Sequence, residues 1–242
     1  MLDARTGAID RFAAPLYTVA EVAQYLHLSA STVRGWAHGY RVSRPKRDLT
    51  GDPVLTTLAG PGGRAAVIPF VGLAEGVVLA AMRRAGVSLQ RIRPALVRLQ
   101  DEVGVAHALA SRRLYTDGVE VLYDYGEHGR DESAAKAARE LVVIRNGQRV
   151  FNTVVEAYVR RLSFADDGYV SLIRLPAYQV ADVVVDPARG FGQPIFERGG
   201  ARIEDVLSLF KSGEPLDVVA EEYGVPREQL EDVLRVALPA AA

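Results

Sequence analysis

Apolar positions near the start of the chain recur at helical spacing. Val22, Ala23 and Leu26 fall on one face of a helix, and polar positions separate them. Thr18 and Glu21 have the spacing of a capping box, in which each side chain bonds the backbone N–H of the other residue. The pattern therefore predicts a short helix that begins just after Thr18.

A second short helix is expected after a tight turn. Ser29 is placed to cap it, and Gly39 is a stop signal after His38. Two short helices joined in this way, with the small Ala23 where they cross, predict a helix-turn-helix. The turn position is usually glycine and is His27 here, so we expect a strained backbone at this residue. The expected packing set is Val22, Leu26, Leu28, Val33 and Trp36.

The next apolar stretches predict a β-hairpin and two longer helices. Residues 54–58 and 65–70 predict strands on either side of a Gly/Pro tip at 60–64, which would form a wing beside the helix-turn-helix. A helix is expected over 70–85, ended by a glycine. A further helix, capped by Ser88, places four apolar side chains on one face: Leu89, Ile92, Leu96 and Leu99.

Strand signals dominate the middle of the chain. Asp117-Gly118 and Asn146-Gly147 are both hairpin signals between apolar runs. Another strand is expected over 169–175. The middle is therefore predicted to be a small β-rich module with one or two helices, used for dimerisation or for binding a partner.

The C-terminal end repeats the pattern of the first helix pair. We expect a short hairpin and then three helices at about 203–212, 215–223 and 227–237. When Ala23 is aligned with Ala220, the apolar core positions keep their character and the turn residue becomes a glycine. The second copy is therefore predicted to keep the fold of the first.

The surface of the second copy differs from that of the first. Three positions that would face a DNA groove become acidic, and carboxylates are repelled by phosphates: Ser31, Arg34 and Gly35 are replaced by Glu228, Glu231 and Asp232. We expect a structural or protein-binding role for this copy, unless a basic face is formed by Arg202, Arg227 and Arg235.

Together these patterns predict an α+β fold that is mainly helical. We expect a winged helix-turn-helix DNA-binding domain at 1–103 and an α+β linking or dimerisation region at 104–181. A hairpin plus a three-helix helix-turn-helix domain is expected at 182–242.

Charge is divided unevenly along the chain. The 242 residues carry 29 Lys/Arg and 30 Asp/Glu, for a formal net charge of −1. Residues 1–115 carry +7, residues 116–181 carry −2 and residues 182–242 carry −6. A basic N-terminal half suits contact with DNA phosphates, so affinity for DNA is expected to fall with salt. The absence of cysteine excludes disulfides, thiolate zinc sites and cysteine nucleophiles.

Neither a membrane segment nor an enzyme is predicted. The chain has no apolar run of 18 residues and no signal peptide, so we expect a cytoplasmic protein. No Walker A run, GxGxxG or GxSxG is present, and no cofactor is expected. Among the four histidines only His128 has acidic neighbours, and a solvated loop accounts for them without a metal.

The residues expected to contact DNA lie on the second helix and the wing. Small and polar side chains at the start of that helix allow close approach to base edges, and arginine can hold a phosphate or recognise guanine. A homodimer is expected, because one such module covers only half of an operator. The expected contacts are Ser29, Ser31, Thr32, Arg34 and His38 from the helix, and Arg41, Lys46, Arg47 and Arg64 from the wing.

The N-terminal stretch YTVAEVAQYLHLSASTVRGWAHGYRV resembles the opening of MerR-type regulators. The stretch RRAGVSLQRIRPAL is similar to the helix that follows the wing in that family. The resemblance covers roughly residues 16–100 and implies DNA binding. The sequence has no effector or metal pocket of the MerR kind, so the resemblance does not imply metal sensing.

The C-terminal stretch, residues 182–238, resembles a small bacterial domain of unknown function that consists of a hairpin and a helix-turn-helix. Ala201 departs from its usual threonine. The matching positions are Gly192, Pro194, Gly200, Arg202, Ile203, Gly213, Ala220 and Tyr223. Such domains often belong to antitoxins encoded beside PIN-domain endoribonuclease toxins, and the whole chain looks like a VapB-type antitoxin.

The resemblance to VapB-type antitoxins implies two partners, the DNA of the chain's own operon and a PIN-domain toxin. PIN toxins as a family have acidic metal centres, which an inserted arginine would complement. Candidate arginines in the middle of the chain are Arg145, Arg149, Arg160 and Arg161, and the alternative is that these side chains are simply solvated.

Two other functions stay open on the sequence. The chain could be a stand-alone MerR-like regulator with no toxin, in which residues 112–242 bind a ligand or form an oligomer. It could also be a protein adaptor that binds no DNA. A gel shift with the DNA upstream of its gene separates the adaptor from the others, and a neighbouring PIN-domain reading frame separates the antitoxin from the regulator.

Overall fold

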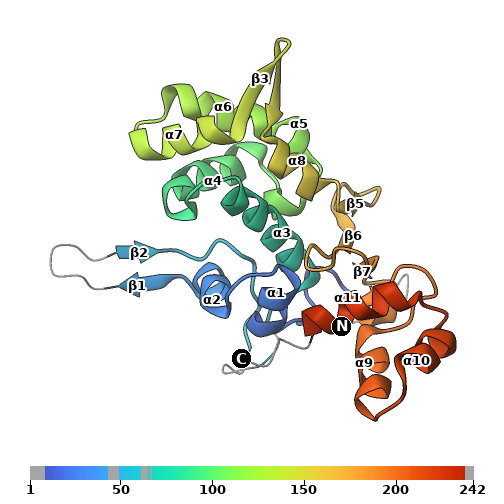
Figure 1. Ribbon diagram of the computed structural model, residues 1–242. Helices are drawn as coiled ribbons and strands as arrows, with labels where there is room; N and C mark the ends of the chain where they lie inside the picture. Colours follow the sequence, from blue (N-terminus) through green and yellow to red (C-terminus); the bar gives the residue numbers. More distant parts are fainter. Residues whose placement is uncertain (1–8, 43–48, 61–64, 66, 238–242) are drawn as a thin grey trace.

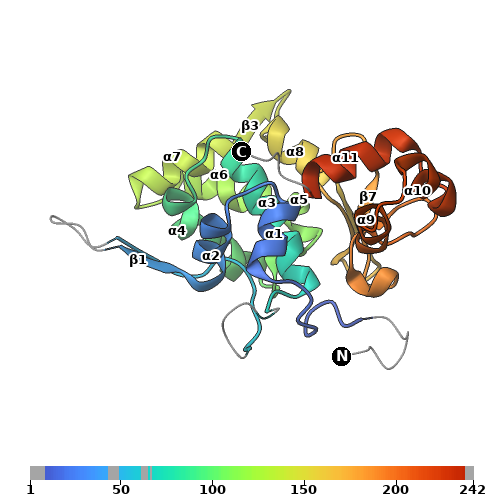
Figure 2. The same ribbon diagram turned by 60° about the horizontal axis from the view of Figure 1, so that its bottom comes forward.

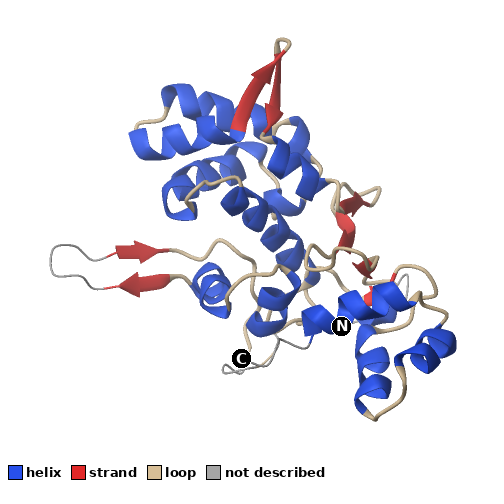
Figure 3. Ribbon diagram, viewed as in Figure 1, coloured by secondary structure: helices blue, strands red, loops and turns tan. Residues whose placement is uncertain are grey.

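The computed structural model describes residues 9–42, 49–60, 65 and 67–237, and it confirms a mixed α+β fold that is mainly helical (Figures 1 and 3). Strands of the described residues form two two-stranded sheets and one four-stranded sheet, all antiparallel. The N-terminal elements are α1 (Val19–Tyr25), α2 (Ala30–His38), β1 (Tyr40–Val42), β2 (Leu49–Gly51), α3 (Phe70–Arg84) and α4 (Leu89–Val103).

Helix α3 is the centre of the core. Every residue from Phe70 to Met82 is buried, because this helix is apolar on all sides and has neighbours all around it. In Figure 1 it lies between α1 and α2 on one side and α4 and α8 on the other. The helix predicted over 70–85 is thus confirmed, and so is the buried face of α4 with Ile92 and Leu99.

The wing hairpin lies one segment earlier than expected. Strands β1 and β2 form it, and the strands predicted over 54–58 and 65–70 do not. The reason is that the backbone N–H groups of the expected strand have other acceptors. Leu55 donates to the Trp36 carbonyl at 3.2 Å, and Thr56 donates to the buried carboxylate of Glu75 at 2.7 Å. The Leu58 N–H does bond to the second expected segment, because it donates to the Val67 carbonyl at 2.7 Å.

The middle of the chain is richer in helix than predicted. Helices α5 and α6 stand where the Asp117-Gly118 hairpin was expected, so that expectation is wrong. Leu114, Gly118 and Leu122 are buried at helical spacing, and this burial against α4 and α7 outweighs the local turn signal. The elements are η1 (Ala108–Ala110), α5 (Arg113–Thr116), α6 (Gly118–His128), α7 (Glu132–Leu141) and α8 (Thr153–Val159).

The second hairpin of the middle region is confirmed. Strands β3 (Val142–Arg145) and β4 (Gln148–Phe151) pair across Asn146 and Gly147. Both turn residues have positive φ, 50° and 78°, as a two-residue hairpin turn of this kind requires. The hairpin projects from the helices at the top of Figure 1, away from α1 and α2.

The C-terminal part contains the predicted hairpin and three helices. The four-stranded sheet has the order β5–β6–β7–β8, so it joins strands from both sides of the boundary expected at 181/182. Its strands are β5 (Leu162–Phe164), β6 (Val170–Arg174), β7 (Val183–Val185) and β8 (Ile195–Phe196), with η2 (Gly190–Gly192) between the last two. The three helices are α9 (Ile203–Lys211), α10 (Leu216–Tyr223) and α11 (Arg227–Ala237).

The C-terminal helices lie beside the helix-turn-helix of the N-terminal part. Figures 1 and 2 both show the end of α11 close to α1, while the wing points away on the opposite side of α2. Within the described ranges, no helix is both long enough and apolar enough to cross a membrane.

Candidate nucleic-acid interface

The first helix of the N-terminal pair begins at a complete capping box. Thr18 donates its N–H to Glu21 Oε2 at 2.7 Å, and the Glu21 N–H donates to Thr18 Oγ1 at 3.2 Å. The box satisfies N–H groups that the first turn of a helix leaves free. This confirms the helix start expected from the sequence and fixes the direction in which α1 leaves the core.

The turn between α1 and α2 is closed through a left-handed residue. His27 has φ of 55°, as expected for the position that glycine usually takes. Its N–H donates to the Gln24 carbonyl at 3.0 Å, and the Leu28 N–H donates to the Ala23 carbonyl at 2.8 Å. These two bonds form the αL helix ending known as a Schellman motif, which turns the chain sharply into α2.

The predicted packing set lies under the two helices. Val22, Leu26, Val33 and Trp36 are buried, and Leu28 is half-buried. Val22 and Leu26 lie against Gly76 of α3, and all five side chains belong to the same core cluster as α3. The other face of α2 is left in solvent. The helix-turn-helix is therefore a rigid platform for whatever its outer face contacts.

The outer face of α2 carries most of the residues expected to contact DNA. Ser29, Ser31, Arg34 and His38 are exposed, while Thr32 is half-buried. Ser29 caps the helix, because its Oγ accepts the Thr32 N–H at 3.3 Å. Hydroxyl groups therefore surround the positive end of α2, which favours a phosphate there.

The basic side chains that the structure describes on this face have no carboxylate partner among the described residues. Arg34, His38 and Arg41 form no ion pair with any residue that the structure describes. Arg41 is exposed on β1 of the wing. Lys46, Arg47 and Arg64, the other cations expected on the wing, lie outside the described residues.

The wing is tied to the rest of the N-terminal part by an aromatic contact. The guanidinium of Arg93 on α4 lies 5.5 Å from the centre of the Tyr40 ring on β1. This distance is typical of a cation–π contact. It orients the first strand of the wing relative to α4.

Two arginines that the sequence did not single out lie next to α2. Arg83 and Arg84 end α3, and the Arg83 guanidinium donates to Thr32 Oγ1 at 3.2 Å. Arg84 lies over the Tyr158 ring at 5.2 Å. In the sequence they look like ordinary basic residues at a helix end, and only the tertiary fold shows that they adjoin the start of α2.

The second helix-turn-helix repeats the backbone of the first, bond for bond. Gly224 takes the place of His27 with φ of 61°, and Val225 donates its N–H to the Ala220 carbonyl at 3.0 Å. Gly224 donates to the Glu221 carbonyl at 3.2 Å. The prediction that the second copy keeps the fold is confirmed.

One of the three acidic replacements is not on the surface. Glu228 and Glu231 are exposed, as expected, but Asp232 is only 2% exposed. Its Oδ2 accepts three backbone N–H groups, from Gln179, Val180 and Ala181, at 2.8 to 3.0 Å. The prediction that Asp232 faces a groove is wrong, because this carboxylate holds the loop before β7 against α11.

The arginines of the second copy do not form a free basic face. Arg227 pairs with Glu231, and hydrogen bonds from its guanidinium to Asp217 and Glu231 raise its pKa. Arg202 pairs with Glu204, and Arg235 pairs with Asp232. All three cations are thus neutralised locally, in contrast to the arginines on α2 and β1.

The candidate toxin-binding arginines lie in the β3–β4 hairpin before α8 and in the turn after α8. Arg149 on β4 donates to Glu120 at 3.0 Å and lies 4.2 Å from the centre of the Tyr123 ring. Arg160 is exposed, and Arg161 is half-buried over the Tyr158 ring. The Arg145 side chain lies outside what the structure describes.

Two family models match the chain. Residues 15–96 match the family described as "Putative DNA-binding HTH domain", and residues 183–237 match "Protein of unknown function (DUF433)". The first match covers α1, α2, the wing, α3 and part of α4. The second covers β7, β8 and the three C-terminal helices.

Curated relatives and a solved structure cover almost the whole chain. "Putative antitoxin VapB45" of Mycobacterium tuberculosis is 48% identical over 227 residues, which are 93% of this chain and 94% of the relative. "Uncharacterized protein Rv2308" of the same organism is 27% identical over 95% of this chain and 91% of its own length. The crystal structure of Rv2018 from M. tuberculosis is similar with a TM-score of 0.79 at 46% identity, covering 93% of this chain and 99% of that one.

Proposed function

Because this chain belongs to the family of VapB-type antitoxins, we propose that it represses its own operon by binding operator DNA and that it neutralises a PIN-domain endoribonuclease toxin. The helix-turn-helix domain and the antitoxin relative support a DNA-binding antitoxin role in general. The proposal contains no catalytic step and no cofactor, and it assigns the chain to the cytoplasm as a homodimer.

The free cations on the face of α2 and β1 carry the DNA-binding half of the proposal. Arg34 and Arg41 have no carboxylate partner among the described residues, whereas Arg227 and Arg235 of the second copy are paired. An unpaired arginine can bind a phosphate or guanine directly, because no ion pair within the protein has to be broken before it contacts DNA. We therefore assign operator contact to the N-terminal copy alone.

The DNA-contact residues proposed from the described face are Ser29, Ser31, Thr32, Arg34, His38 and Arg41. Arg34 occupies the middle of the exposed face of α2, where it would lie deepest in the major groove. Lys46 and Arg47, which lie between β1 and β2 in the sequence, and Arg64, which follows the wing, remain part of the proposal from the sequence. Each cation that neutralises a phosphate adds to the salt dependence of binding.

Charge reversal at Arg34 tests operator binding. We expect Arg34→Glu to weaken binding to the chain's own upstream DNA about 100-fold or more, since it removes a contact and adds a repulsion. Fluorescence anisotropy at several salt concentrations measures the affinity and its salt slope. Arg130→Glu, the same charge change at an exposed residue before α7, is the control and should leave operator affinity nearly unchanged. Equal affinities for wild type and Arg34→Glu would refute the assignment.

The toxin half of the proposal is tested with the product of the neighbouring gene. We expect the full chain to co-purify with a PIN-domain protein encoded next to it and to suppress its RNA cleavage. Arg160→Glu with Arg161→Glu should weaken this inhibition more than Arg149→Glu, because Arg149 is already paired with Glu120 and stacked on Tyr123. Full inhibition by the double variant would remove these two arginines from the toxin surface.

A further inference from the structure

The turn Gly190-Phe191-Gly192 exposes a large aromatic side chain on a strained backbone. All three residues have positive φ, at 57°, 55° and 71°. Glycine adopts this conformation at little cost, but a residue with a side chain loses about 1–3 kcal/mol. Phe191 is nevertheless 74% exposed, so it gains little from burial in its own chain. Such a residue has the properties of an anchor that becomes buried in a complex.

Residues of the protein core pack closely against the turn on the side away from solvent. The buried Tyr17 hydroxyl donates to the Gly192 carbonyl at 2.6 Å. A Cβ atom on Gly192 would lie 2.9 Å from Leu16 Cδ1, and one on Gly190 would lie 2.5 Å from Ile195 Cγ2. The side chains of Leu16 and Ile195 therefore leave room only for glycine on either side of Phe191. Together with the Tyr17 bond, this close packing under the turn leaves Phe191 exposed as a preorganised feature.

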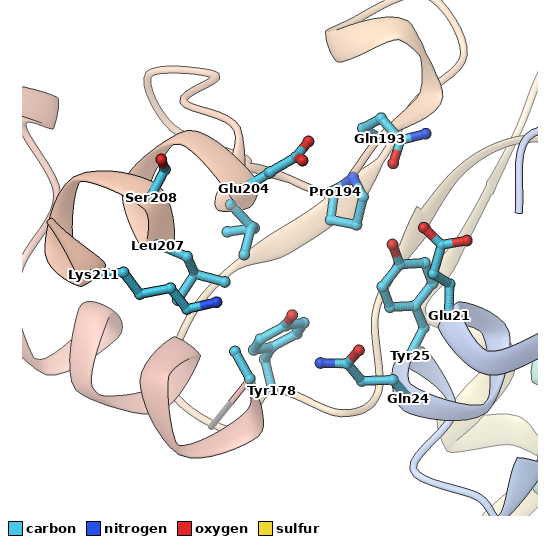
Figure 4. Close-up of a pocket in the computed structure, with 12 residues that line it drawn as sticks. Glu21, Gln24, Tyr25, Tyr178, Gln193, Pro194, Glu204, Leu207, Ser208 and Lys211 are labelled. Atoms are coloured by element: carbon cyan, nitrogen blue, oxygen red, sulfur yellow. The ribbon is translucent and has the colours of Figure 1, made fainter. Parts of the chain in front are cut away.

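A cleft of about 440 Å³ opens directly after this turn (Figure 4). Gln193 and Pro194 form one side of it, α1 contributes Gln24 and Tyr25, and α9 lies opposite. Burial raises the pKa of both tyrosine hydroxyls in the cleft, to about 12 for Tyr178, so that they stay neutral. Tyr25, Tyr178 and Leu207 give the cleft apolar walls, and its volume is large enough to hold an aromatic ring.

We propose that two copies of this chain associate by exchanging Phe191, each copy inserting it into the partner's cleft between α1 and α9. An interface with two-fold symmetry uses the same patch on both copies, so the anchor and the receiving cleft must lie within one surface patch of the chain. They do so here, because Gln193 and Pro194 of the cleft follow Phe191 by two and three residues.

The charges around the anchor and the cleft do not oppose the association of two copies. Beside the turn, Arg189 is paired with Asp186. On the cleft rim Glu204 is paired with Arg202, and Glu21 and Lys211 have opposite signs. Two identical patches can therefore meet without an excess of like charge.

The inference rests on the proposed function in one respect. An operator with two half-sites requires a dimeric repressor, and the Phe191 exchange would form that dimer. Helix α1 lines the cleft and also belongs to the helix-turn-helix. An interface at α1 would therefore fix the spacing between the two recognition helices, which must match the spacing of the operator half-sites.

Site-directed crosslinking tests the exchange directly, because the natural chain contains no cysteine. Full-length Phe191→Cys and Gln24→Cys proteins, carrying tags of different size, are mixed and oxidised. We expect a disulfide-linked heterodimer that dithiothreitol dissolves. Phe191→Cys mixed with Arg130→Cys is the control and should give little heterodimer. Equal yields in the two mixtures would overturn the proposal.

A second variant separates an interface role from a structural one. Phe191→Gly relieves the backbone strain, so we expect its melting temperature to stay the same or rise. Its dimer dissociation constant, measured by analytical ultracentrifugation, should increase at least about 30-fold, as for an interface hot spot. Val97→Ser, a similarly exposed apolar residue on α4, should leave the dimer unchanged.

The outcomes are distinct from those that test DNA binding. A wild-type chain that stays monomeric at tens of micromolar overturns the exchange, and so does a Phe191→Gly variant that dimerises normally. A variant that dimerises normally but loses a PIN-domain toxin would show that Phe191 anchors the toxin instead. Crosslinking and dimerisation without operator binding would leave the exchange standing and refute the proposed repressor function.

Discussion

Asp232 is the residue that fastens the last helix to the loop before β7. Burial alone raises the pKa of its carboxyl, but hydrogen bonds from Ala181, Val180 and Gln179 and the charge of Arg235 outweigh it and hold the pKa below the usual 3.8. A carboxylate with a depressed pKa in the folded state stabilises that state above the unfolded pKa. The stabilisation is lost as the pH falls through the folded pKa.

Asp232→Asn is therefore expected to destabilise the protein in a pH-dependent way. At pH 7 the free energy of unfolding should fall by about 2–3 kcal/mol, because charge-assisted bonds to three N–H groups are weakened. The difference from wild type should shrink as the pH falls from about 5 through 3.8 and below. Urea unfolding at a series of pH values measures it, with the exposed Glu228→Gln as control. A difference that grows toward low pH would contradict the assigned pKa shift.

The role of Asp232 could not be found from the sequence. Its position in α11 aligns with Gly35 of α2, and a charged residue there looks like part of a solvated face. The three N–H groups that it accepts lie more than 50 residues earlier in the chain. The exposure of Arg34 and His38 was predictable, because helical spacing alone separates them from the buried Val33 and Trp36.

Local elements were predictable where short-range signals and packing agree. The left-handed residue at His27, the Asn146-Gly147 hairpin and the three C-terminal helices are confirmed. Asp117-Gly118 was misassigned because the same residues suit a hairpin turn and a helix start, and contacts with α4 and α7 decide between them. The wing was misplaced because the Thr56 N–H is captured by Glu75, 19 residues away.

The two helix turns permit a matched stability experiment, since they share a backbone but have a different residue, His27 or Gly224, at the left-handed position. His27→Gly should raise the free energy of unfolding by about 0.5–1 kcal/mol, because the left-handed conformation costs glycine little. Gly224→Ala should lower it by about 1 kcal/mol. Apart from the neighbouring residues in the chain, no described atom lies within 4 Å of the added Cβ, so this cost comes from the backbone conformation.

Both turn variants can be measured by thermal and urea unfolding. His27→Gly should bind operator DNA with wild-type affinity, since His27 belongs to the turn and is not among the proposed contacts. A stabilised variant with reduced operator affinity would place His27 at the DNA surface. A destabilised His27→Gly would mean that the His27 side chain contributes contacts worth more than the backbone strain.

At the scale of the whole molecule, the two ends of the chain are joined in one core. Ile9 donates its N–H to the Pro187 carbonyl at 3.2 Å, and Arg11 donates to the Val170 carbonyl at 3.0 Å. Tyr17 is fully buried and reaches Gly192, 175 residues later. The sequence predicted separate units at 1–103 and 182–242, and no periodic pattern could have revealed contacts between them.

Tyr17→Phe tests how strongly the two ends depend on each other. Burial raises the pKa of the Tyr17 hydroxyl well above its usual value, so the group stays protonated and donates to Gly192. Removing only the hydroxyl keeps the ring against Tyr25, 6.1 Å away, and leaves a buried carbonyl without its donor. We expect a loss of about 1–2 kcal/mol in the free energy of unfolding.

The same substitution should also loosen the Phe191 turn, because the Tyr17 hydroxyl is one of the contacts that fix it. Tyr17→Phe is therefore expected to weaken the proposed dimer severalfold, as a preorganised anchor becomes mobile. Calorimetry gives the stability, and ultracentrifugation gives the dimer constant. Tyr123→Phe, on the far α6, is the matched control and should change neither quantity by much. A stability loss without any change in the dimer constant would mean that the turn keeps its shape without the Tyr17 bond, through its packing against Leu16 and Ile195.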